Sequence, residues 1–300
     1  METSLVIRLG SRGSELALWQ ANFTKDKLEE AGYHVEIIII KTTGDITTHL
    51  SFDKIEGKGF FTKEIEDALL NNEIDLAVHS MKDLPTESPK GLRIGGISYR
   101  ANPSDWLVIR REAYVPGHDL FLKENAIVGT SSARRKAQLL HLKPDIEIRD
   151  LRGNVPTRIQ KLREGNFDAI LLAAAGIERL NISLDEFEIV QLNPKEFVPA
   201  AAQGVLAFQV REGDAFALDV AKKLHNSKTL ETVGIERKIL KLMEGGCQMP
   251  LGIYCEKDQN HYFHVWAAVA DQWSGPLRKV QLSRSTNFQL AEDVVKALKC

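Results

Sequence analysis

The sequence lacks several features that mark particular classes of protein. It has no excess of basic charge, because 39 Lys and Arg stand against 41 Asp and Glu among 300 residues. This near-neutral balance argues against nucleic acid as a partner, since such binding uses a general positive field. The longest apolar run, around 169–177, is far too short to span a membrane. The first residues, Met-Glu-Thr-Ser, carry no basic segment, so we expect no secretory signal and a cytoplasmic protein.

Cysteine and metal-binding motifs are scarce as well. The three cysteines, Cys247, Cys255 and Cys300, are an odd number, which predicts free thiols in a reducing compartment. Neither H-E-x-x-H nor C-x-x-C occurs, so we expect no metal site. Gly57-Lys58-Gly59 lacks the upstream glycine and the following Ser or Thr of a P-loop, and it favours a flexible lid over a nucleotide site.

What the sequence does contain is the patterning of an α/β protein. Apolar runs such as 5–9, 35–40 and 169–173 alternate with segments of helical spacing. Strands that alternate with helices at this length predict parallel sheets with crossover helices. With 43% apolar and 27% charged residues, the composition is that of an ordinary globular protein.

Changes of pattern along the chain predict three domains. Asn102-Pro103 interrupts the first α/β unit, and 194–204 indicates a second crossing that returns a strand to it. We therefore expect domain 1 to comprise 1–100 and 197–218, and domain 2 to comprise 101–196. Domain 3, 219–300, has shorter alternating segments and two helices, which predict a small α+β unit with an antiparallel sheet.

Basic and small polar residues follow the predicted strands directly. They occur in Ser11-Arg12-Gly13-Ser14, in 79–83, in 129–135 and in 151–158. In open α/β sheets, ligands bind beyond the carboxyl ends of the strands. Helix N-termini and arginine side chains both favour anions. The pattern therefore predicts a site for a ligand with several carboxylates or phosphates.

Each of these motifs also has a plain structural interpretation. The segment 129–135 could be a helix cap followed by solvated arginines, and Lys82-Asp83 could be a surface ion pair. His79 on its own is more typical of a structural histidine. Cys247 follows a predicted helix C-terminus, whose partial negative charge opposes thiolate formation, so thiol chemistry alone favours an incidental cysteine. The paired glycine before it would allow a large group to approach closely.

Taken in order, these strings resemble one family, hydroxymethylbilane synthase, also called porphobilinogen deaminase. The resemblance extends from Arg8 to about Gly252. The strings that carry it are SELALWQ (14–20), GKGFFTKE (57–64), AVHSMKDL (77–84), GTSSARR (129–135), LRGN (151–154), AAAG (173–176) with Arg179, and GGCQMP (245–250).

The resemblance implies a chemistry and a cofactor. Members of the family carry dipyrromethane joined by a thioether to the cysteine of the GGCQ string, here Cys247. They condense four porphobilinogen molecules head to tail on this primer, release ammonia at each addition, and liberate hydroxymethylbilane by hydrolysis. By resemblance Asp83 is the catalytic carboxylate, which steadies positive charge beside a pyrrole N–H.

The resemblance also implies binding residues for the cofactor and the growing oligopyrrole chain. Each pyrrole ring bears an acetate and a propionate, which calls for many cationic side chains. The segment with Lys58 and Phe61 resembles the family's mobile flap. The binding residues implied are Arg12, Ser14, Gln20, Lys82, Thr130, Ser132, Arg134, Arg135, Arg149, Arg152, Arg158 and Arg179.

The fold implied by the resemblance is two domains like those of type II periplasmic binding proteins, linked by a double crossover, and a small third domain that carries the cysteine. A monomer without nucleic-acid or membrane partners is expected. Ala202 departs from the family, since many relatives have glycine there in the second crossing. Cys255 and Cys300 match no function of the family.

Two other functions remain open from the sequence. A two-lobed protein that binds an anion without chemistry would share the arginines at the strand ends, but it would not need Asp83 or a thiol on a third domain. A nucleic-acid binder could use Arg134, Arg135 and Arg152, but the near-neutral charge counts against it.

Overall fold

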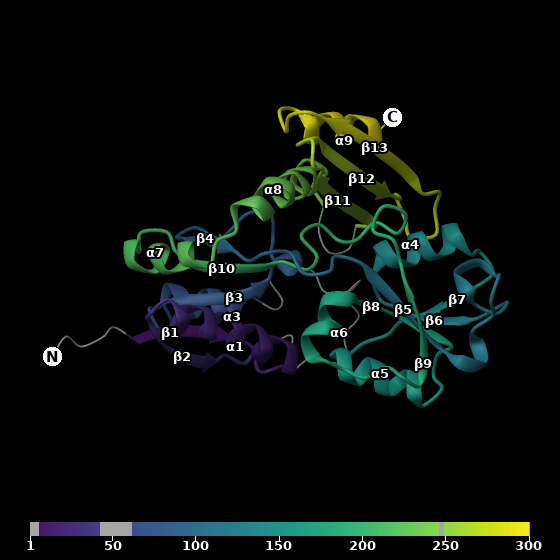
Figure 1. Ribbon diagram of the computed structural model, residues 1–300, viewed down its shortest axis with the longest axis horizontal. Coiled ribbons are helices and arrows are strands. Elements are labelled where there is room, and N and C mark those ends of the chain that lie inside the picture. The colour runs from purple at the N-terminus through teal and green to yellow at the C-terminus, as the bar shows by residue number, and fades with distance from the viewer. Residues whose placement is uncertain (1–5, 43–61, 246–248, 300) are drawn as a thin grey trace. The chain divides into compact units, whose positions relative to one another are not determined.

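The structure is a computed structural model that describes residues 6–42, 62–245 and 249–299 (Figure 1). Contacts between residues divide the chain into two units. The first unit is Met1–Ala101 with Gly204–Glu231, and the second is Asn102–Gln203 with Thr232–Cys300. The predicted division into three domains stays a prediction.

The first unit is built on a five-stranded sheet with the order β2-β1-β3-β10-β4. β1, β2 and β3 are parallel, whereas β10 runs antiparallel to both of its neighbours. Leu9, Leu76 and Phe208 are fully buried in the core of this sheet. The strands are β1 Val6–Ser11, β2 His34–Ile39, β3 Leu76–Ser80, β4 Leu92–Ile97 and β10 Leu206–Arg211.

In the part of the first unit that the structure describes, the helices that pack on this sheet are α1 Glu15–Glu30, α3 Lys63–Leu70 and α7 Ala215–Lys223. α1 contacts β1, β2 and β3. α7 lies so close to β4 that a Cβ on Gly96 would collide with the backbone oxygen of Ala221. Glycine in β4 therefore lets the helix approach the strand, as close backbone packing requires.

The second unit contains another five-stranded sheet, with the order β7-β6-β8-β5-β9. β6 is parallel to β7 and β8, while β5 is antiparallel to β8 and β9. Leu107, Val128 and Leu171 are buried in its core. The elements are β5 Asp105–Arg110, β6 Ile127–Gly129, α4 Ala133–Leu142, β7 Glu147–Arg149, α5 Val155–Arg163, β8 Ala169–Ala173, α6 Ala174–Leu180 and β9 Phe187–Gln191.

The end of the chain forms a separate antiparallel sheet, β11-β12-β13, within the second unit. Its core contains Ile253, Val265 and Val294, with the last of these on α9. The boundary between the two units in the sequence, Glu231 to Thr232, falls within α8. The bounds are α8 Ser227–Leu242, β11 Leu251–Lys257, β12 Phe263–Val269, β13 Arg278–Arg284 and α9 Leu290–Lys299.

The architecture confirms the predicted fold class and corrects one detail. We expected parallel sheets, but both five-stranded sheets are mixed, because β10 in one and β5 in the other run antiparallel to their neighbours. β5 and β10 each follow a crossing between the units, so no crossover helix within their own unit fixes their direction. Within the described ranges, no helix has the length and apolarity needed to traverse a bilayer.

Candidate active site

The first part of the candidate site follows two neighbouring strands of the first unit. β1 and β3 are parallel and pair with each other, so their carboxyl ends lie at the same edge of the sheet. Arg12 and Ser14 follow β1. Lys82 and Asp83 follow β3, in the single turn of 3-10 helix η2, Met81–Asp83. The structure therefore brings these four predicted residues to one end of one sheet, as ligand sites of open α/β sheets require.

Other predicted residues fix the shape of this edge. The Ser14 hydroxyl caps α1 by accepting a hydrogen bond from the Ala17 N–H at 3.4 Å. The Gln20 side-chain amide donates to the Ser80 hydroxyl at 2.9 Å, which ties α1 to the end of β3. Lys82 is half-buried, whereas the Asp83 carboxylate is exposed. The edge thus presents an acidic group on a braced turn.

His79 lies directly behind this turn and is buried. Its Nε2 lies 3.1 Å from the Gln209 carbonyl oxygen, and the Gln209 amide nitrogen donates to Glu66 at 3.0 Å. Since Gln209 accepts through its oxygen here, the neutral imidazole carries its proton on Nε2. Burial lowers the pKa of His79 to about 4, and the hydrogen bond with Gln209 offsets this only in part. His79 is therefore a neutral structural residue.

This histidine makes stability depend on pH. Its pKa is lower in the folded chain than the ordinary 6.5, so unfolding takes up a proton below pH 6.5. The stability it contributes is fully present above pH 6.5 and is lost as the pH falls toward 4. Between pH 7.5 and 5.0 we expect a loss of about 2 kcal/mol from this group. Urea unfolding at both values should show that loss, and His79→Gln should lose about 2 kcal/mol less than the parent protein; an equal loss would contradict the assignment.

The second part of the candidate site follows the parallel strands of the second unit. β6 is the parallel neighbour of both β7 and β8, so the carboxyl ends of the three strands share an edge. Thr130 follows β6, and Arg149 is the last residue of β7, with Arg152 shortly after it. Arg179 lies on α6, which begins directly after β8.

The turn between β6 and α4 is organised by its own hydroxyl groups. Thr130 accepts a hydrogen bond from the Ser132 N–H at 3.3 Å, and Ser132 caps α4 by accepting from the Arg135 N–H at 3.4 Å. Ser131 donates to the Leu151 carbonyl at 3.0 Å, which joins this turn to the one after β7. The helix cap that the sequence suggested is present at Ser132. The hydrogen bond from Ser131 to Leu151 links the two predicted anion-binding segments, 129–135 and 151–158.

Arg134 and Arg135 point into the second unit rather than into solvent. Arg134 Nη1 lies 2.8 Å from Asp105 Oδ2, and Arg135 Nη2 lies 2.7 Å from Asp105 Oδ1. Both arginines are 6% exposed and Asp105 is fully buried. Burial alone would raise the pKa of Asp105, but the charges of the two arginines outweigh it and lower that pKa far below its usual range. The carboxylate is therefore ionised.

The remaining arginines lie nearer to solvent. Arg149 is exposed and pairs with Glu147 at 2.6 Å. Arg158 is half-buried on α5, and its Nε donates to the Gly153 carbonyl at 2.7 Å. Arg152 and Arg179 are half-buried as well. These side chains give the second unit a cationic edge beside β6, β7 and β8.

The predicted residues thus form two groups, one in each unit. The first unit carries Arg12, Ser14, Gln20, Lys82 and Asp83. The second unit carries the hydroxyl and arginine residues at 130–135, 149, 152, 158 and 179. Lys58, Phe61, Cys247 and Cys300 lie outside the described residues. The roles assigned to all these residues stay predictions.

Sequence reasoning missed Asp105 and Gln203, which join the arginines of the second unit. The Gln203 amide donates to Asp105 Oδ1 at 3.0 Å and to the Pro103 carbonyl at 2.8 Å. One signal was available in the sequence: an acidic residue, Asp105, immediately precedes the apolar run Trp106–Ile109, two residues after Pro103. A buried carboxylate needs cationic partners, which the sequence contains at 134 and 135.

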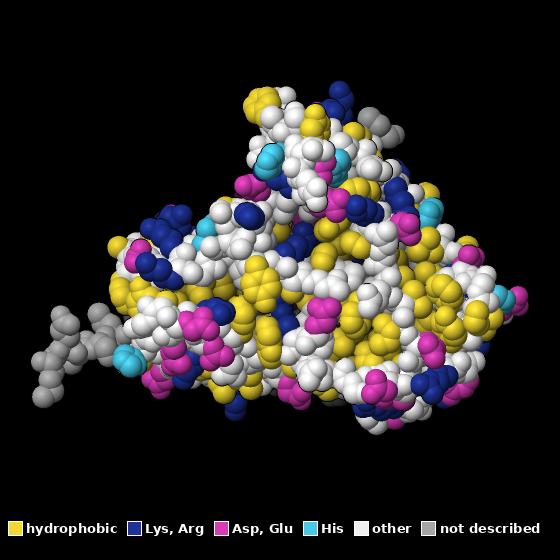
Figure 2. Space-filling model, in the orientation of Figure 1, with side chains coloured by type: hydrophobic (Ala, Val, Ile, Leu, Met, Phe, Trp, Pro, Cys, Tyr) yellow, Lys and Arg dark blue, Asp and Glu magenta, His cyan; other side chains and the backbone are white. Residues whose placement is uncertain are grey.

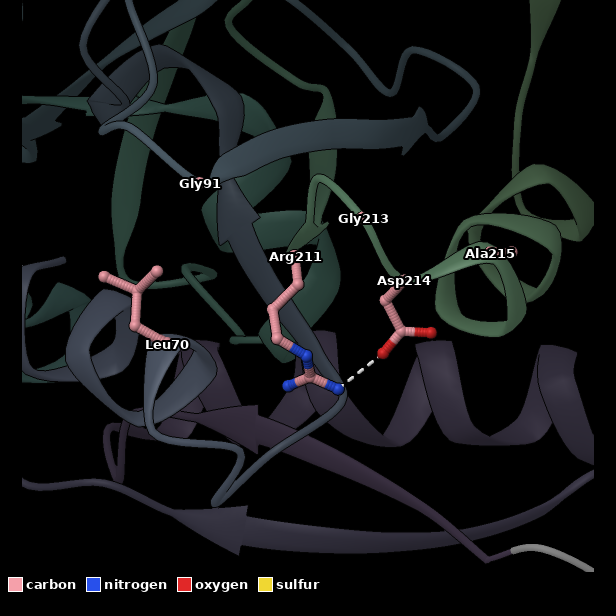
Figure 3. Close-up of a pocket in the computed structure, with 6 residues that line it drawn as sticks. All are labelled: Leu70, Gly91, Arg211, Gly213, Asp214 and Ala215. Carbon is pink, nitrogen blue, oxygen red and sulfur yellow. Dashed lines mark hydrogen bonds and ion pairs between the residues drawn. The ribbon is translucent and has the colours of Figure 1, made fainter.

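A hollow of about 520 Å³ lies at the opposite end of the first unit's sheet. Arg211 and Asp214 line this hollow (Figure 3). Asp214 is the N-cap of α7, and its Oδ2 lies 2.6 Å from Arg211 Nη2. Arg211 also donates to the Leu69 and Ile74 carbonyls. Its guanidinium is therefore committed to the protein, and the hollow is not the candidate site. On the face in Figure 2, basic and acidic side chains are interspersed over the described residues, without a broad patch of one sign.

The comparison with known families shows to which family the chain belongs. The family model described as "Porphobilinogen deaminase, dipyromethane cofactor binding domain" matches residues 7–219. The chain belongs to the porphobilinogen deaminase family. This match confirms the resemblance seen in the sequence and the predicted dipyrromethane cofactor.

Individual relatives in the porphobilinogen deaminase family cover most of the chain. The protein of that name from a Nitratiruptor species is 42% identical over 97% of this chain and 93% of its own. The one from Nitratidesulfovibrio vulgaris (strain DP4) is 46% identical over 88% of this chain and 82% of its own. Among solved structures, a periplasmic substrate-binding protein of an ABC transporter from Coxiella burnetii is 13% identical, with a TM-score of 0.44 over 74% of this chain and 92% of its own.

Proposed function

We propose that this protein is a hydroxymethylbilane synthase, a transferase that condenses four porphobilinogen molecules head to tail. Each addition releases ammonia, and water finally liberates the linear tetrapyrrole. The observation that carries this proposal is the exposed carboxylate of Asp83 beside Lys82, on a braced turn after β3. It occurs in a chain that matches the dipyrromethane cofactor domain over residues 7–219.

The charges of the second unit fit a ligand made of carboxylate-bearing pyrroles. Arg134 and Arg135 share the single carboxylate of Asp105, and the Nε–H of Arg135 is buried without a partner among the described residues. Arg149 is the last residue of β7, Arg152 follows it, and Arg158 lies in the first turn of α5. Guanidinium groups bind carboxylates through two parallel hydrogen bonds, so such a set suits a chain of diacids.

Asp83 has a separate role in this proposal. When porphobilinogen loses ammonia, positive charge develops on its pyrrole ring, and a fixed carboxylate nearby stabilises that charge. Asp83 is suited to this because it lies on a short 3-10 turn and not on a long loop. Lys82, on the same turn, binds a ring carboxylate and orients the substrate.

The residue that attaches the cofactor is proposed to be Cys247. Dipyrromethane, when bound, supplies the pyrrole carbon to which the first substrate is joined. Cys255 is not suited to attachment, since it is 2% exposed and packs in the core between β11 and α9. A thiol in a packed core is inaccessible to a group of this size.

Intact-mass measurement tests the proposal. We expect the purified protein to be heavier than its sequence mass by one dipyrromethane, with peptide mapping to Cys247. Cys247→Ser should lack both the added mass and turnover, because no thioether can form. Cys255→Ser is the matched control and should keep both. Active protein with an unmodified Cys247 would contradict the proposal.

The two-lobed binding protein without catalysis is the alternative that this experiment also examines. Such a protein would bind porphobilinogen without release of ammonia and without a covalent adduct. We further propose that the protein is cytoplasmic and a monomer. Light scattering tests the oligomeric state and should show a species of about 33.6 kDa plus the cofactor. A stable dimer in the same measurement would contradict the monomer.

A further inference from the structure

The cluster of Asp105, Arg134, Arg135 and Gln203 connects three distant segments of the second unit. Asp105 opens β5 after the first crossing, the arginines lie in the first turn of α4, and Gln203 ends the second crossing. One carboxylate accepts hydrogen bonds from all three partners, at 2.7 to 3.0 Å. Asp105 is therefore the acidic side chain that both guanidinium groups share, beside one backbone carbonyl for each of them.

The cluster is unbalanced in charge. It holds two guanidinium groups and one carboxylate, so it keeps one unit of positive charge. Among the described residues, Asp105 is the acidic partner within ion-pair distance of either arginine. The other acceptors, the Val198 and Leu171 carbonyls, are neutral. A buried charge is weakly screened by solvent, so the excess raises the potential at the start of α4.

The hydrogen-bonding capacity of the cluster is also incomplete. The Nε–H of Arg135 is buried and has no partner among the residues that the structure describes. Buried donors are normally satisfied, and an exception calls for an explanation. An acidic ligand at the turn 130–132 would supply both the missing negative charge and an acceptor.

We propose that Asp105 is a positioning residue for the oligopyrrole site. It directs Arg134 and Arg135, limits their excess charge to one unit, and through Gln203 ties them to the second crossing. This inference rests on the proposed function. Asp105 itself does not contact the reacting atoms, because its carboxylate is fully buried by its partners.

Asp105→Asn tests the proposal, with Asp75→Asn as the matched control. Asp75 also lies between two arginines, Arg8 at 2.7 Å and Arg211 at 3.3 Å, but it precedes β3, at the end of the sheet opposite to Asp83. Both changes remove one carboxylate charge and keep its shape. Each change leaves two arginines without the carboxylate charge that they share. The loss of protein stability that results should therefore occur in both variants.

The readouts are the fraction of protein that carries dipyrromethane, by intact mass, and the KM and kcat of the loaded fraction with porphobilinogen. For Asp105→Asn we expect a loaded fraction at least about fivefold lower, a KM about tenfold higher, and a kcat within about threefold of the parent. For Asp75→Asn we expect a lower Tm but an unchanged loaded fraction and KM. Equal loading and KM in the two variants would overturn the positioning role.

A second variant covers the case in which Asp105→Asn does not fold. Gln203→Met keeps the volume of the side chain but removes the amide that donates to Asp105. We expect its KM to rise about threefold and its loaded fraction to fall, with a small change in Tm; parental values would overturn the proposal. The parent protein is measured in parallel, and if it neither gains mass nor consumes porphobilinogen, the proposed function itself has failed.

Discussion

Asp83→Asn should lower kcat by about 10²–10³-fold and leave the protein folded. The amide has the shape of the carboxylate but no negative charge, so it cannot stabilise the positive charge that develops as ammonia leaves. Because Asp83 is exposed at the end of β3, its replacement removes little packing. The KM should change far less than kcat, since the lost interaction belongs to the transition state.

Single-turnover release of ammonia is the direct measurement, made on variant protein whose cofactor loading is known from its mass. Asp67→Asn is the matched control, since Asp67 is an exposed aspartate on α3 of the same unit. It should keep the parental kcat. A kcat for Asp83→Asn within about threefold of the parent would remove Asp83 from the chemistry.

Glu236→Ala is expected to have the largest effect on stability. Glu236 lies on α8 and is fully buried. One carboxylate oxygen accepts the Ala202 N–H and the other accepts the Cys255 N–H, both at 2.7 Å. The change leaves two buried backbone donors unpaired, at about 1–3 kcal/mol each, so we expect a loss of about 3 kcal/mol or more.

The backbone conformation of Ala202 makes its hydrogen bond to Glu236 more important for stability. Its φ is 62°, in the left-handed region, which is unfavourable for a residue with a Cβ by roughly 1–2 kcal/mol. Glycine at this position would avoid the strain, because it has no Cβ. The hydrogen bond from Ala202 to Glu236 therefore supports a strained point of the second crossing.

Denaturant unfolding, followed by circular dichroism, measures the effect of Glu236→Ala. Glu231→Ala makes the same change at an exposed position of the same helix and should cost less than about 1 kcal/mol. If the two variants unfold at the same urea concentration, Glu236 does not stabilise the second crossing in the way that its contacts imply.

Local features of the fold were predictable because they depend on neighbours in the sequence. The sequence placed a helix cap at Ser14 and strands close to Val6–Ser11 and His34–Ile39, all of which the structure contains. Pro156 was expected in the first turn of a helix, and it lies in the first turn of α5. The antiparallel sheet near the end of the chain was expected from its short alternating segments.

The part that sequence patterns could not give depends on contacts between distant segments. Arg134 and Arg135 were expected to be either solvated or bound to a ligand, yet both contact Asp105, about thirty residues earlier in the chain. Gln203 reaches the same carboxylate from nearly a hundred residues away. Periodicity reports which face of an element is buried, but not which buried charges meet.

The strand order of the first unit has a consequence for synthesis on the ribosome. β10 lies between β3 and β4, although it is encoded after the whole of β5 to β9. Until residues 206–211 leave the exit tunnel, β3 and β4 have no strand between them and present open edges. The β5–β9 sheet is contiguous in sequence, so we expect it to fold first, against the usual N-to-C order of domain folding. Nascent chains stalled before residue 206 should therefore be the species most prone to misassembly and most dependent on chaperones.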